Sequence, residues 1–293
     1  MREFEEALRR ARAGVSDPLP TKDGPAVEPP VRQEYARRAE PQPSRPQVQA
    51  LQPLHAPSAP SNTHVFPPLT ADIAFFRESF GSQGGDSAVV DGAFRILRTR
   101  VLEAMKVKGG QVLGITSPAP GAGKTVTAIH LALACARRPE QTVILADFDY
   151  RRPAVAQYLD ATGFKPSIDY FRGEGQALDY LYRNEAGNLL FMLTDRSTEM
   201  SAEHLASSRF AAALDSLRGV AEDALVILDL PPMTGCDDTL AVMPRLDGVL
   251  LVVAAGESRF SHLEETVAQI PKDKLIGTVL NKAEGAGAAY DYY

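Results

Sequence analysis

The sequence predicts an α/β fold: a doubly wound, mainly parallel sheet covered by helices on both faces and preceded by a disordered N-terminal extension. Six short runs rich in Val, Ile and Leu alternate with helical patterns over residues 86–283, and this alternation is typical of a parallel sheet. The runs are almost continuously apolar, as expected of strands that are buried on both faces. The first 70 residues contain 13 of the 22 prolines, and such a composition cannot offset the entropy cost of folding.

We divide the chain into an extension, residues 1–85, a folded domain, residues 86–283, and a C-terminal tail, residues 284–293. Residues 1–13 can form a short helix with Phe4 and Leu8 on one side. It is either a solvated helix or a docking peptide for a partner or a membrane surface. Residues 14–70 are rich in Pro, Gln, Ala and Ser and are expected to form a flexible linker.

A helix is expected to open the domain near residue 86, because apolar residues recur there at helical spacing. They are Val90, Phe94, Leu97, Val101 and Met105. The predicted strands follow at residues 111–117, 142–149, 188–194, 224–230, 248–256 and 274–282. Helical patterns lie between them, for example at residues 124–138 and 202–218.

Composition and charge exclude several classes of protein. The net charge of −6 argues against nonspecific nucleic-acid binding. No apolar stretch reaches the 18 residues that would indicate a membrane span, and the N-terminus lacks the apolar core of a signal peptide. Cys135 and Cys236 have neither metal-ligand spacing nor the pattern of a disulfide framework. We therefore expect a cytoplasmic protein.

The loop after the first predicted strand, SPAPGAGKT at residues 117–125, has the character of a phosphate-binding loop. Gly121 and Gly123 allow the backbone to approach a ligand closely, and the following helix N-terminus favours an anion. Lys124 can reach the β- and γ-phosphates of a nucleotide, and the Thr125 hydroxyl can bind Mg²⁺. Pro118 replaces the first glycine of the strict motif. The loop indicates a fold of the P-loop NTPase type with ATP and Mg²⁺ as cofactors.

Three acidic residues follow two later strands of the predicted sheet. Asp147 and Asp149 lie two positions apart, so an extended chain places them on the same side. Asp229 ends the apolar run ALVILDL, as a Walker B aspartate does. The carboxyl ends of parallel strands carry the ligand site of doubly wound sheets. These carboxylates can hold Mg²⁺ or accept a proton from an attacking hydroxyl.

Together these motifs resemble those of the bacterial tyrosine kinases of capsule and exopolysaccharide biosynthesis, deviant Walker P-loop ATPases related to the MinD/ParA group. The resemblance covers roughly residues 86–293. It rests on SPAPGAGKT as the Walker A motif, ILADFDYRRP as A′ and VILDLPP as Walker B, with AFRILRTR before them and LDGVLLVVAAG, GTVLNK and the terminal tyrosines after them.

The resemblance implies a role for each matching residue. Lys124 would polarise the phosphates, Thr125 and Asp229 would serve Mg²⁺, and Asn281 would recognise adenine. Asp147 and Asp149 would orient the metal and the attacking hydroxyl, with Asp147 the better candidate base. Arg151 and Arg152 lie beside the site without an assigned role. The remaining nucleotide-binding residues would be Ala119, Pro120, Gly121, Ala122, Gly123 and Val126.

The family pattern also implies partners. A membrane-anchored polysaccharide chain-length regulator would activate the kinase and recruit it to the inner face of the cell membrane. The family's oligomerisation motif, E-x-x-R-x-x-R, is matched at Arg95 and Arg98, whereas Gly92 stands at the glutamate position with Asp91 before it. A homo-oligomer is expected, and its size stays open. Ala119 stands where MinD/ParA proteins carry their signature lysine, which favours the kinase branch.

The C-terminal tail ends in AAYDYY and carries three candidate phosphorylation sites, Tyr290, Tyr292 and Tyr293. Eleven residues after Lys282 span at most about 40 Å, enough to reach a neighbouring subunit. We therefore expect autophosphorylation between subunits. The alternatives are a P-loop ATPase switch that positions a membrane partner without tyrosine transfer, and a nucleotide-binding scaffold with a weakened site.

Overall fold

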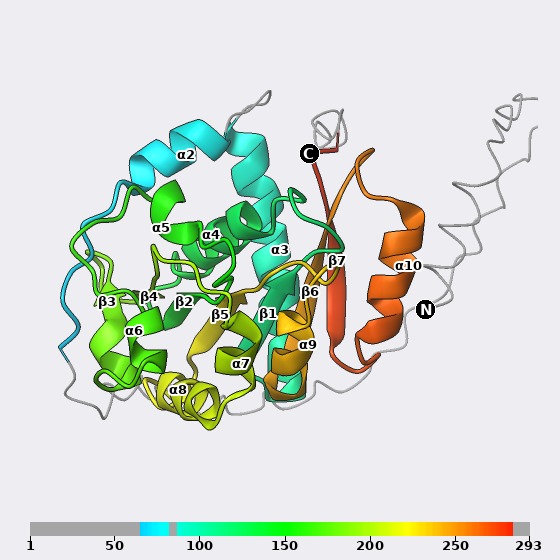
Figure 1. The fold of residues 1–293 in the computed structure, drawn as a ribbon. Coiled ribbons are helices and arrows are strands. Elements are labelled where there is room, and N and C mark those ends of the chain that lie inside the picture. Colours follow the sequence, from blue (N-terminus) through cyan, green and yellow to red (C-terminus); the bar gives the residue numbers. More distant parts are fainter. Residues whose placement is uncertain (1–64, 82–86, 284–293) are drawn as a thin grey trace, which may run out of the picture. The chain divides into compact units, whose positions relative to one another are not determined.

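A seven-stranded sheet in the order β3-β4-β2-β5-β1-β6-β7 forms the centre of the computed structural model (Figure 1). The structure describes residues 65–81 and 87–283. The strands are β1 (Val112–Thr116), β2 (Val143–Asp147), β3 (Leu181–Arg183), β4 (Leu189–Met192), β5 (Leu225–Asp229), β6 (Gly248–Ala254) and β7 (Leu275–Asn281). All neighbouring strands are parallel except β3 and β4. The predicted doubly wound, mainly parallel sheet is confirmed.

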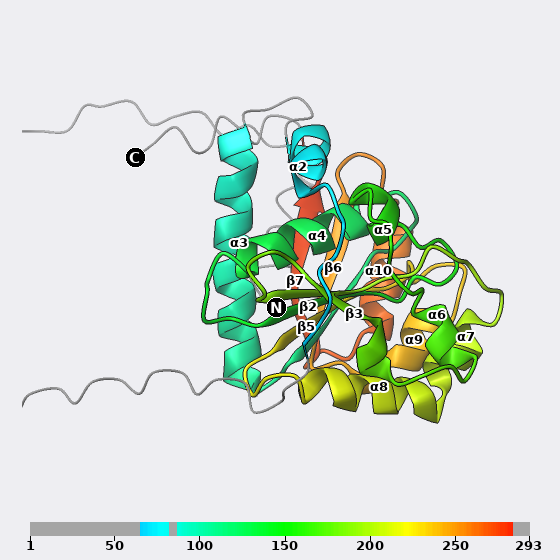
Figure 2. The same ribbon diagram turned by 90° about the vertical axis from the view of Figure 1, so that its left-hand side faces the viewer.

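Helices cover both faces of this sheet, as Figure 2 shows edge-on. One face packs on α2 (Ile73–Gly81), α3 (Ser87–Lys108), α4 (Lys124–Cys135) and α5 (Val155–Tyr158). The other packs on α6 (Ile168–Phe171), α7 (Ser201–Ala206), α8 (Ser208–Arg218), α9 (Asp238–Val242) and α10 (Phe260–Gln269), with the 3₁₀ turns η1 (Ala177–Tyr180) and η2 (Met243–Arg245). Two apolar cores result, because alternate side chains of each strand enter opposite faces.

The strand register brings the acidic residues together. Asp147 at the end of β2 is paired with Asp229 at the end of β5, and Ile115 of β1 is paired with the same Asp229. The phosphate loop leaves β1 one residue later. The loop and the acids therefore meet at the carboxyl edge of three adjacent strands, where a doubly wound sheet carries its ligand site.

One of the predicted helices is observed as a single helix, whereas another is observed as two. The first predicted helix is observed as α3, and its apolar face buries Val101 and Met105. The pattern at residues 202–218 forms two helices, because Ser207 is extended, with φ −73° and ψ 162°. Its hydroxyl accepts a hydrogen bond from the Phe210 N–H and so caps the start of α8.

The N-terminal boundary of the domain lies earlier than the sequence predicts. Residues 65–81 were assigned to the disordered extension, yet the structure packs them on the domain. Leu69 N–H donates to the Arg183 carbonyl at 2.9 Å, and Phe76 of α2 is fully buried, 4.7 Å from the His130 ring of α4. The expectation of disorder is wrong for these residues, because their aromatic side chains complete the core. The rest of the extension, its predicted helix included, lies outside the described residues.

Strand β3 was not predicted. It is three residues long and antiparallel at the edge of the sheet, so it carries little of the apolar pattern by which the other six were found. None of the helices that the structure describes is long and apolar enough to cross a membrane.

Candidate nucleotide-binding site

The phosphate loop connects β1 to α4 and depends on two glycines in the left-handed region. Gly121 has φ 82° and Gly123 has φ 89°, values that other residues rarely adopt. A Cβ at Gly123 would also lie 2.0 Å from Asn281 Nδ2. Glycine is therefore required at position 123 both for its backbone angle and for the close approach of β7.

The carbonyl groups of the loop are held by donors from the protein. Ser117 O accepts from Met233 N–H at 2.8 Å, Pro118 O from the Thr234 hydroxyl at 2.6 Å, and Ala122 O from Asn281 Nδ2 at 2.9 Å. Gly123 O accepts from the N–H and hydroxyl of Thr127. In a trans peptide the next N–H points the opposite way. The N–H groups of residues 119, 123 and 124 are thus turned away from these donors, as a loop that binds anions requires.

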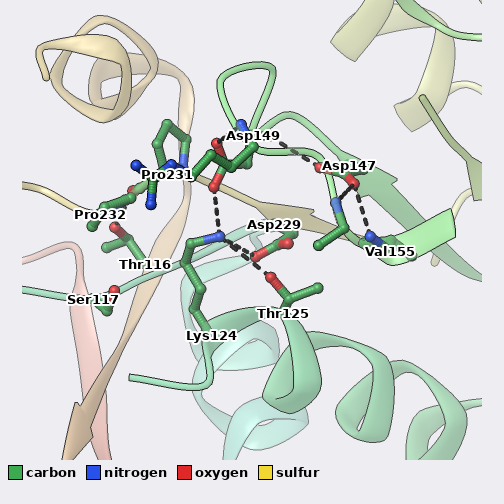
Figure 3. A network of polar contacts seen from close by, with 12 residues as sticks. Thr116, Ser117, Lys124, Thr125, Asp147, Asp149, Val155, Asp229, Pro231 and Pro232 are labelled. Carbon is green, nitrogen blue, oxygen red and sulfur yellow. Dashed lines mark hydrogen bonds and ion pairs between the residues drawn. The ribbon is translucent and has the colours of Figure 1, made fainter. Parts of the chain in front are cut away.

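Lys124 lies between two carboxylates (Figure 3). Its Nζ is 2.7 Å from Asp149 Oδ2 and 3.5 Å from Asp229 Oδ1. Burial lowers the pKa of Lys124, but the charges of Asp229 and Asp149 outweigh this effect, so that the pKa is raised. The lysine is therefore a permanent cation whose present partners are acids of the same site.

Asp147 is fully buried and holds a helix N-terminus. Its Oδ2 accepts the N–H groups of Ala154 and Val155, both at 3.0 Å, and its Oδ1 accepts the Asp149 N–H at 3.1 Å. Both oxygens are thus engaged by the backbone that joins β2 to α5. Burial and the neighbouring Asp229 charge raise the pKa of Asp147, while the N–H donors oppose them. These hydrogen bonds indicate that Asp147 stabilises the conformation of this loop.

Asp229 differs from the other two acids in its hydrogen bonding. It is fully buried, and its Oδ2 has no hydrogen-bond partner among the described residues. Burial raises the pKa of Asp229, although the Lys124 charge opposes the rise. A buried carboxylate oxygen without a partner is costly unless a ligand or water completes it. The described residues contain no group of three side chains that could hold a metal alone. Mg²⁺, which keeps several waters and uses one or two carboxylates, nevertheless fits Asp229 and the nearby Thr125.

A cavity of about 430 Å³ opens beside these residues. The phosphate loop forms one wall, and the segment after β5 forms another. That segment is fastened to β1, because the Thr116 hydroxyl donates to Pro231 O at 2.7 Å. The lining residues are Pro120, Gly121, Gly123, Lys124, Thr125, Val126, Asp149, Arg151, Arg152, Tyr158, Pro231, Pro232, Thr234, Gly235 and Cys236.

Two arginines follow Asp149 in the wall of the cavity. Arg151 Nη2 lies 2.8 Å from Asp238 Oδ1 at the start of α9, so the loop after β2 is tied to the segment after β5. Asp238 is fully buried, and no sequence motif marked it. Tyr158, which also lines the cavity, was missed for the same reason. Its ring packs edge-on against Phe80 of α2, with 4.8 Å between the centroids.

The structure brings the predicted residues of the loop, the three acids and both arginines to one edge of the sheet. Asn281 lies against the loop backbone, where its amide donates to Ala122 O, and it does not line the cavity. Its expected contact with adenine stays a prediction. Tyr290, Tyr292 and Tyr293 lie outside the described residues, so their role as acceptors is likewise untested.

A family model of the CobQ/CobB/MinD/ParA nucleotide binding domain matches residues 113–291. This range begins in β1 and includes the phosphate loop, the three acids and β7. Every residue that lines the cavity falls within the matched range.

Three curated relatives carry the name tyrosine-protein kinase. YwqD of Bacillus subtilis is 28% identical over 206 residues, covering 68% of this chain and 84% of YwqD. CpsD of Streptococcus agalactiae is 25% identical over 203 residues, covering 68% of this chain and 86% of CpsD. EpsB of Ralstonia nicotianae is 27% identical over 202 residues, and there the match spans 26% of EpsB, about a quarter of that longer protein.

Among solved structures, the kinase domain of the Escherichia coli tyrosine kinase ETK superposes with a TM-score of 0.64. It is 25% identical to this chain, and the match covers 76% of this chain and 86% of the ETK domain.

Proposed function

The chain belongs to the CobQ/CobB/MinD/ParA family of nucleotide-binding domains, and from this premise we propose that it is an ATP-dependent protein-tyrosine kinase that phosphorylates its own C-terminal tyrosines between subunits. The names of its relatives support the kinase activity. The observation that carries the proposal is that Lys124, which lines the cavity beside the phosphate loop, contacts both Asp149 and Asp229.

The residues of the loop would bind and orient the triphosphate. Backbone N–H groups and the N-terminus of α4 favour the phosphates, and Lys124 supplies positive charge to the transferring phosphoryl group. Thr125 and Asp229 are the residues that would hold Mg²⁺, which neutralises charge that develops on the phosphates. Because Lys124 now pairs with Asp149, phosphate binding would exchange one anionic partner of the lysine for another.

This exchange would prepare the proton acceptor. In the transfer, the tyrosine hydroxyl oxygen forms a bond to the γ-phosphorus while the bond from that phosphorus to the bridging oxygen of ADP breaks. The phenolic proton must pass to a base. Asp149 lines the cavity, whereas both oxygens of Asp147 are engaged by backbone N–H groups. We therefore assign the proton to Asp149, once Lys124 has turned to the phosphates, and revise the preference for Asp147 that the motif alone suggested.

We further propose that the kinase regulates the polymerisation and export of an exopolysaccharide or capsule. A membrane-anchored chain-length regulator would activate it and recruit it to the inner face of the membrane. This setting rests on the resemblance to the bacterial tyrosine kinases. Phosphates on the tail would add about 1.5 to 2 negative charges each, so phosphorylation would favour separation of the subunits of a homo-oligomer.

The test is incubation of the purified protein with labelled ATP and Mg²⁺, followed by mapping of phosphotyrosine. Replacement of Tyr290, Tyr292 and Tyr293 by Phe should remove most of the label while ATP hydrolysis continues. This variant should also phosphorylate a Lys124→Met protein, whose tail is intact and whose site is inactive. Circular dichroism of the Lys124→Met protein provides the control for folding.

A MinD/ParA-like ATPase switch is the second candidate, because the matching family model includes those proteins. It predicts ATP hydrolysis without any phosphotyrosine, even when the cytoplasmic segment of a membrane regulator is added. That result would replace the kinase proposal. Undiminished turnover in the Lys124→Met protein would contradict both candidates, since both place the phosphates on this lysine.

A further inference from the structure

Among the residues that the structure describes, one positively charged side chain in the wall of the cavity has no partner for its charge. Lys124 pairs with Asp149 and Asp229, and Arg151 pairs with Asp238. The fourth charged side chain is Arg152, which is exposed and also lines the cavity. Within residues 65–81 and 87–283, no ion pair or hydrogen bond is formed by its guanidinium group.

The backbone fixes Arg152 beside the candidate base. Its N–H lies 3.0 Å from Asp149 Oδ1 and 3.1 Å from the Asp149 carbonyl, so it donates within a tight turn. Pro153 follows and restricts the chain further. An anion held by this guanidinium would therefore lie close to the hydroxyl that Asp149 deprotonates.

We propose that Arg152 binds a carboxylate next to the acceptor tyrosine, and that the cavity thereby selects acidic, tyrosine-containing peptides. The inference rests on the proposed kinase activity and names the substrate class of that site. A guanidinium group matches a carboxylate with two parallel hydrogen bonds, which is why an arginine suits this position.

The C-terminus of the chain has the required chemistry. Asp291 is the immediate neighbour of both Tyr290 and Tyr292 in the sequence Tyr-Asp-Tyr-Tyr. Adjacent Cα atoms are 3.8 Å apart, so a carboxylate on Arg152 and a hydroxyl near Asp149 can belong to neighbouring residues.

The experiment measures transfer to added peptides. The kinase is the full chain with Tyr290, Tyr292 and Tyr293 replaced by Phe, so that label enters only the peptide. One peptide has the sequence of residues 284–293, and the other carries Asp291→Asn. We expect the loss of the carboxylate to raise the peptide KM about threefold to fivefold, the scale of one partly exposed ion pair.

Arg152→Gln in the kinase should raise the KM of the acidic peptide by the same factor. It should not raise the KM of the Asp291→Asn peptide further, because the two changes remove one interaction. Arg152→Glu should in turn prefer a peptide with Asp291→Arg over the natural one. Arg245→Gln is the matched control: Arg245 is exposed and precedes β6, at the opposite edge of the sheet.

Three results would overturn the inference. The first is a peptide KM that does not depend on Arg152 or on Asp291. The second is a loss of ATP affinity in Arg152→Gln as large as its loss for the peptide, which would assign the arginine to the nucleotide phosphates. The third is an equal effect of Arg245→Gln, which would show a general effect of charge. Absence of phosphotyrosine in every combination would instead overturn the proposed function, and this inference with it.

Discussion

The two edges of the central sheet each contain a buried or half-buried aspartate, and the two are treated in opposite ways. At the amino edge, before β6, Asp247 Oδ2 accepts N–H groups from Gln111 at 2.9 Å and Val112 at 2.8 Å, and lies 3.3 Å from Arg218 Nη2. At the carboxyl edge, Asp229 Oδ2 has no partner among the described residues. Asp247, whose acceptors are satisfied, joins the start of β1 to the residue before β6, whereas Asp229 has an oxygen that remains available to a ligand.

The pKa values of the two acids move in opposite directions. Burial raises the pKa of Asp247, but the N–H donors of Val112 and Gln111 and the charge of Arg218 outweigh it, so the pKa is lowered. Burial raises the pKa of Asp229, and the Lys124 charge offsets this only in part. Folding thus favours the ionised form of one acid and disfavours that of the other, and the difference can be measured.

The largest expected effect is on the rate of phosphoryl transfer, which should differ strongly between substitutions of Asp229 and of Asp247. Asp229→Asn removes the carboxylate that we propose to bind Mg²⁺ and should slow phosphoryl transfer about a hundredfold or more, the usual loss when a group that stabilises the transition state is removed. Asp247→Asn should leave the rate within about twofold, because Asp247 is remote from the cavity. Steady-state assays with labelled ATP provide the measurement. Similar losses in both variants would mean that the two edges are not separate in function.

The free energy of unfolding should respond in the opposite order, with the larger loss in Asp247→Asn. Asp247→Asn exchanges a charged acceptor of several hydrogen bonds for a weaker one and should lower the free energy of unfolding at neutral pH by about 1–2 kcal/mol. Asp229→Asn removes a buried charge that also raises the pKa of Asp147, so the free energy of unfolding should stay equal or rise. Urea denaturation without nucleotide tests both. A clear loss of stability in Asp229→Asn would show that its charge supports the fold.

The pH dependence of these differences should follow the signs of the pKa shifts. Above an ordinary aspartate pKa of about 3.9, Asp247 stabilises the native state, and this contribution is lost as pH falls through its lower native pKa. The cost of Asp247→Asn should therefore begin to fall below about pH 4 and vanish only below the native pKa of Asp247. Asp229 destabilises the native state increasingly as pH rises above its ordinary pKa, so any gain from Asp229→Asn should shrink toward pH 4. Parallel curves for both variants would contradict the assigned shifts.

The smallest effect concerns a structural residue at the functional edge. Asn281→Ala removes the donor to Ala122 O and loosens the phosphate loop. One hydrogen bond of about 1 kcal/mol corresponds to roughly a fivefold loss of ATP affinity, measured by calorimetry. The loss should be similar for ADP, GTP and ATP, because the contact shapes the loop. A loss confined to adenine nucleotides would instead restore the predicted role of Asn281 in adenine recognition.

The sequence predicts the fold better than the interior of the site. Six strands follow from their continuous apolar runs, and the meeting of Lys124 with the acids follows from parallel strands that end at one edge. The division of labour between Asp147 and Asp149 does not, because it depends on which backbone N–H groups of α5 lie within hydrogen-bond distance. Tyr158 lines the cavity and Asp238 pairs with Arg151 of its wall through tertiary packing, which leaves no local pattern.

Helix α2 was missed for a different physical reason. Its residues follow a proline-rich stretch, and its own apolar pattern is short. The composition of the preceding stretch therefore led us to expect disorder here as well. The helix becomes stable only through the core that it completes, where Phe76 is fully buried. Tertiary burial here overrides the local signal.

That burial has a practical consequence for work with the isolated domain. A recombinant fragment cut at residue 86, where sequence alone would place the boundary, would lose Phe76 and Phe80 and expose the rings of His130 and Tyr158 that they cover. Such a fragment would expose an apolar patch next to the cavity. We expect it to aggregate or to show an altered ATP affinity. Expression from residue 65 keeps the cover in place. Limited proteolysis should accordingly leave residues 65–81 attached to the domain.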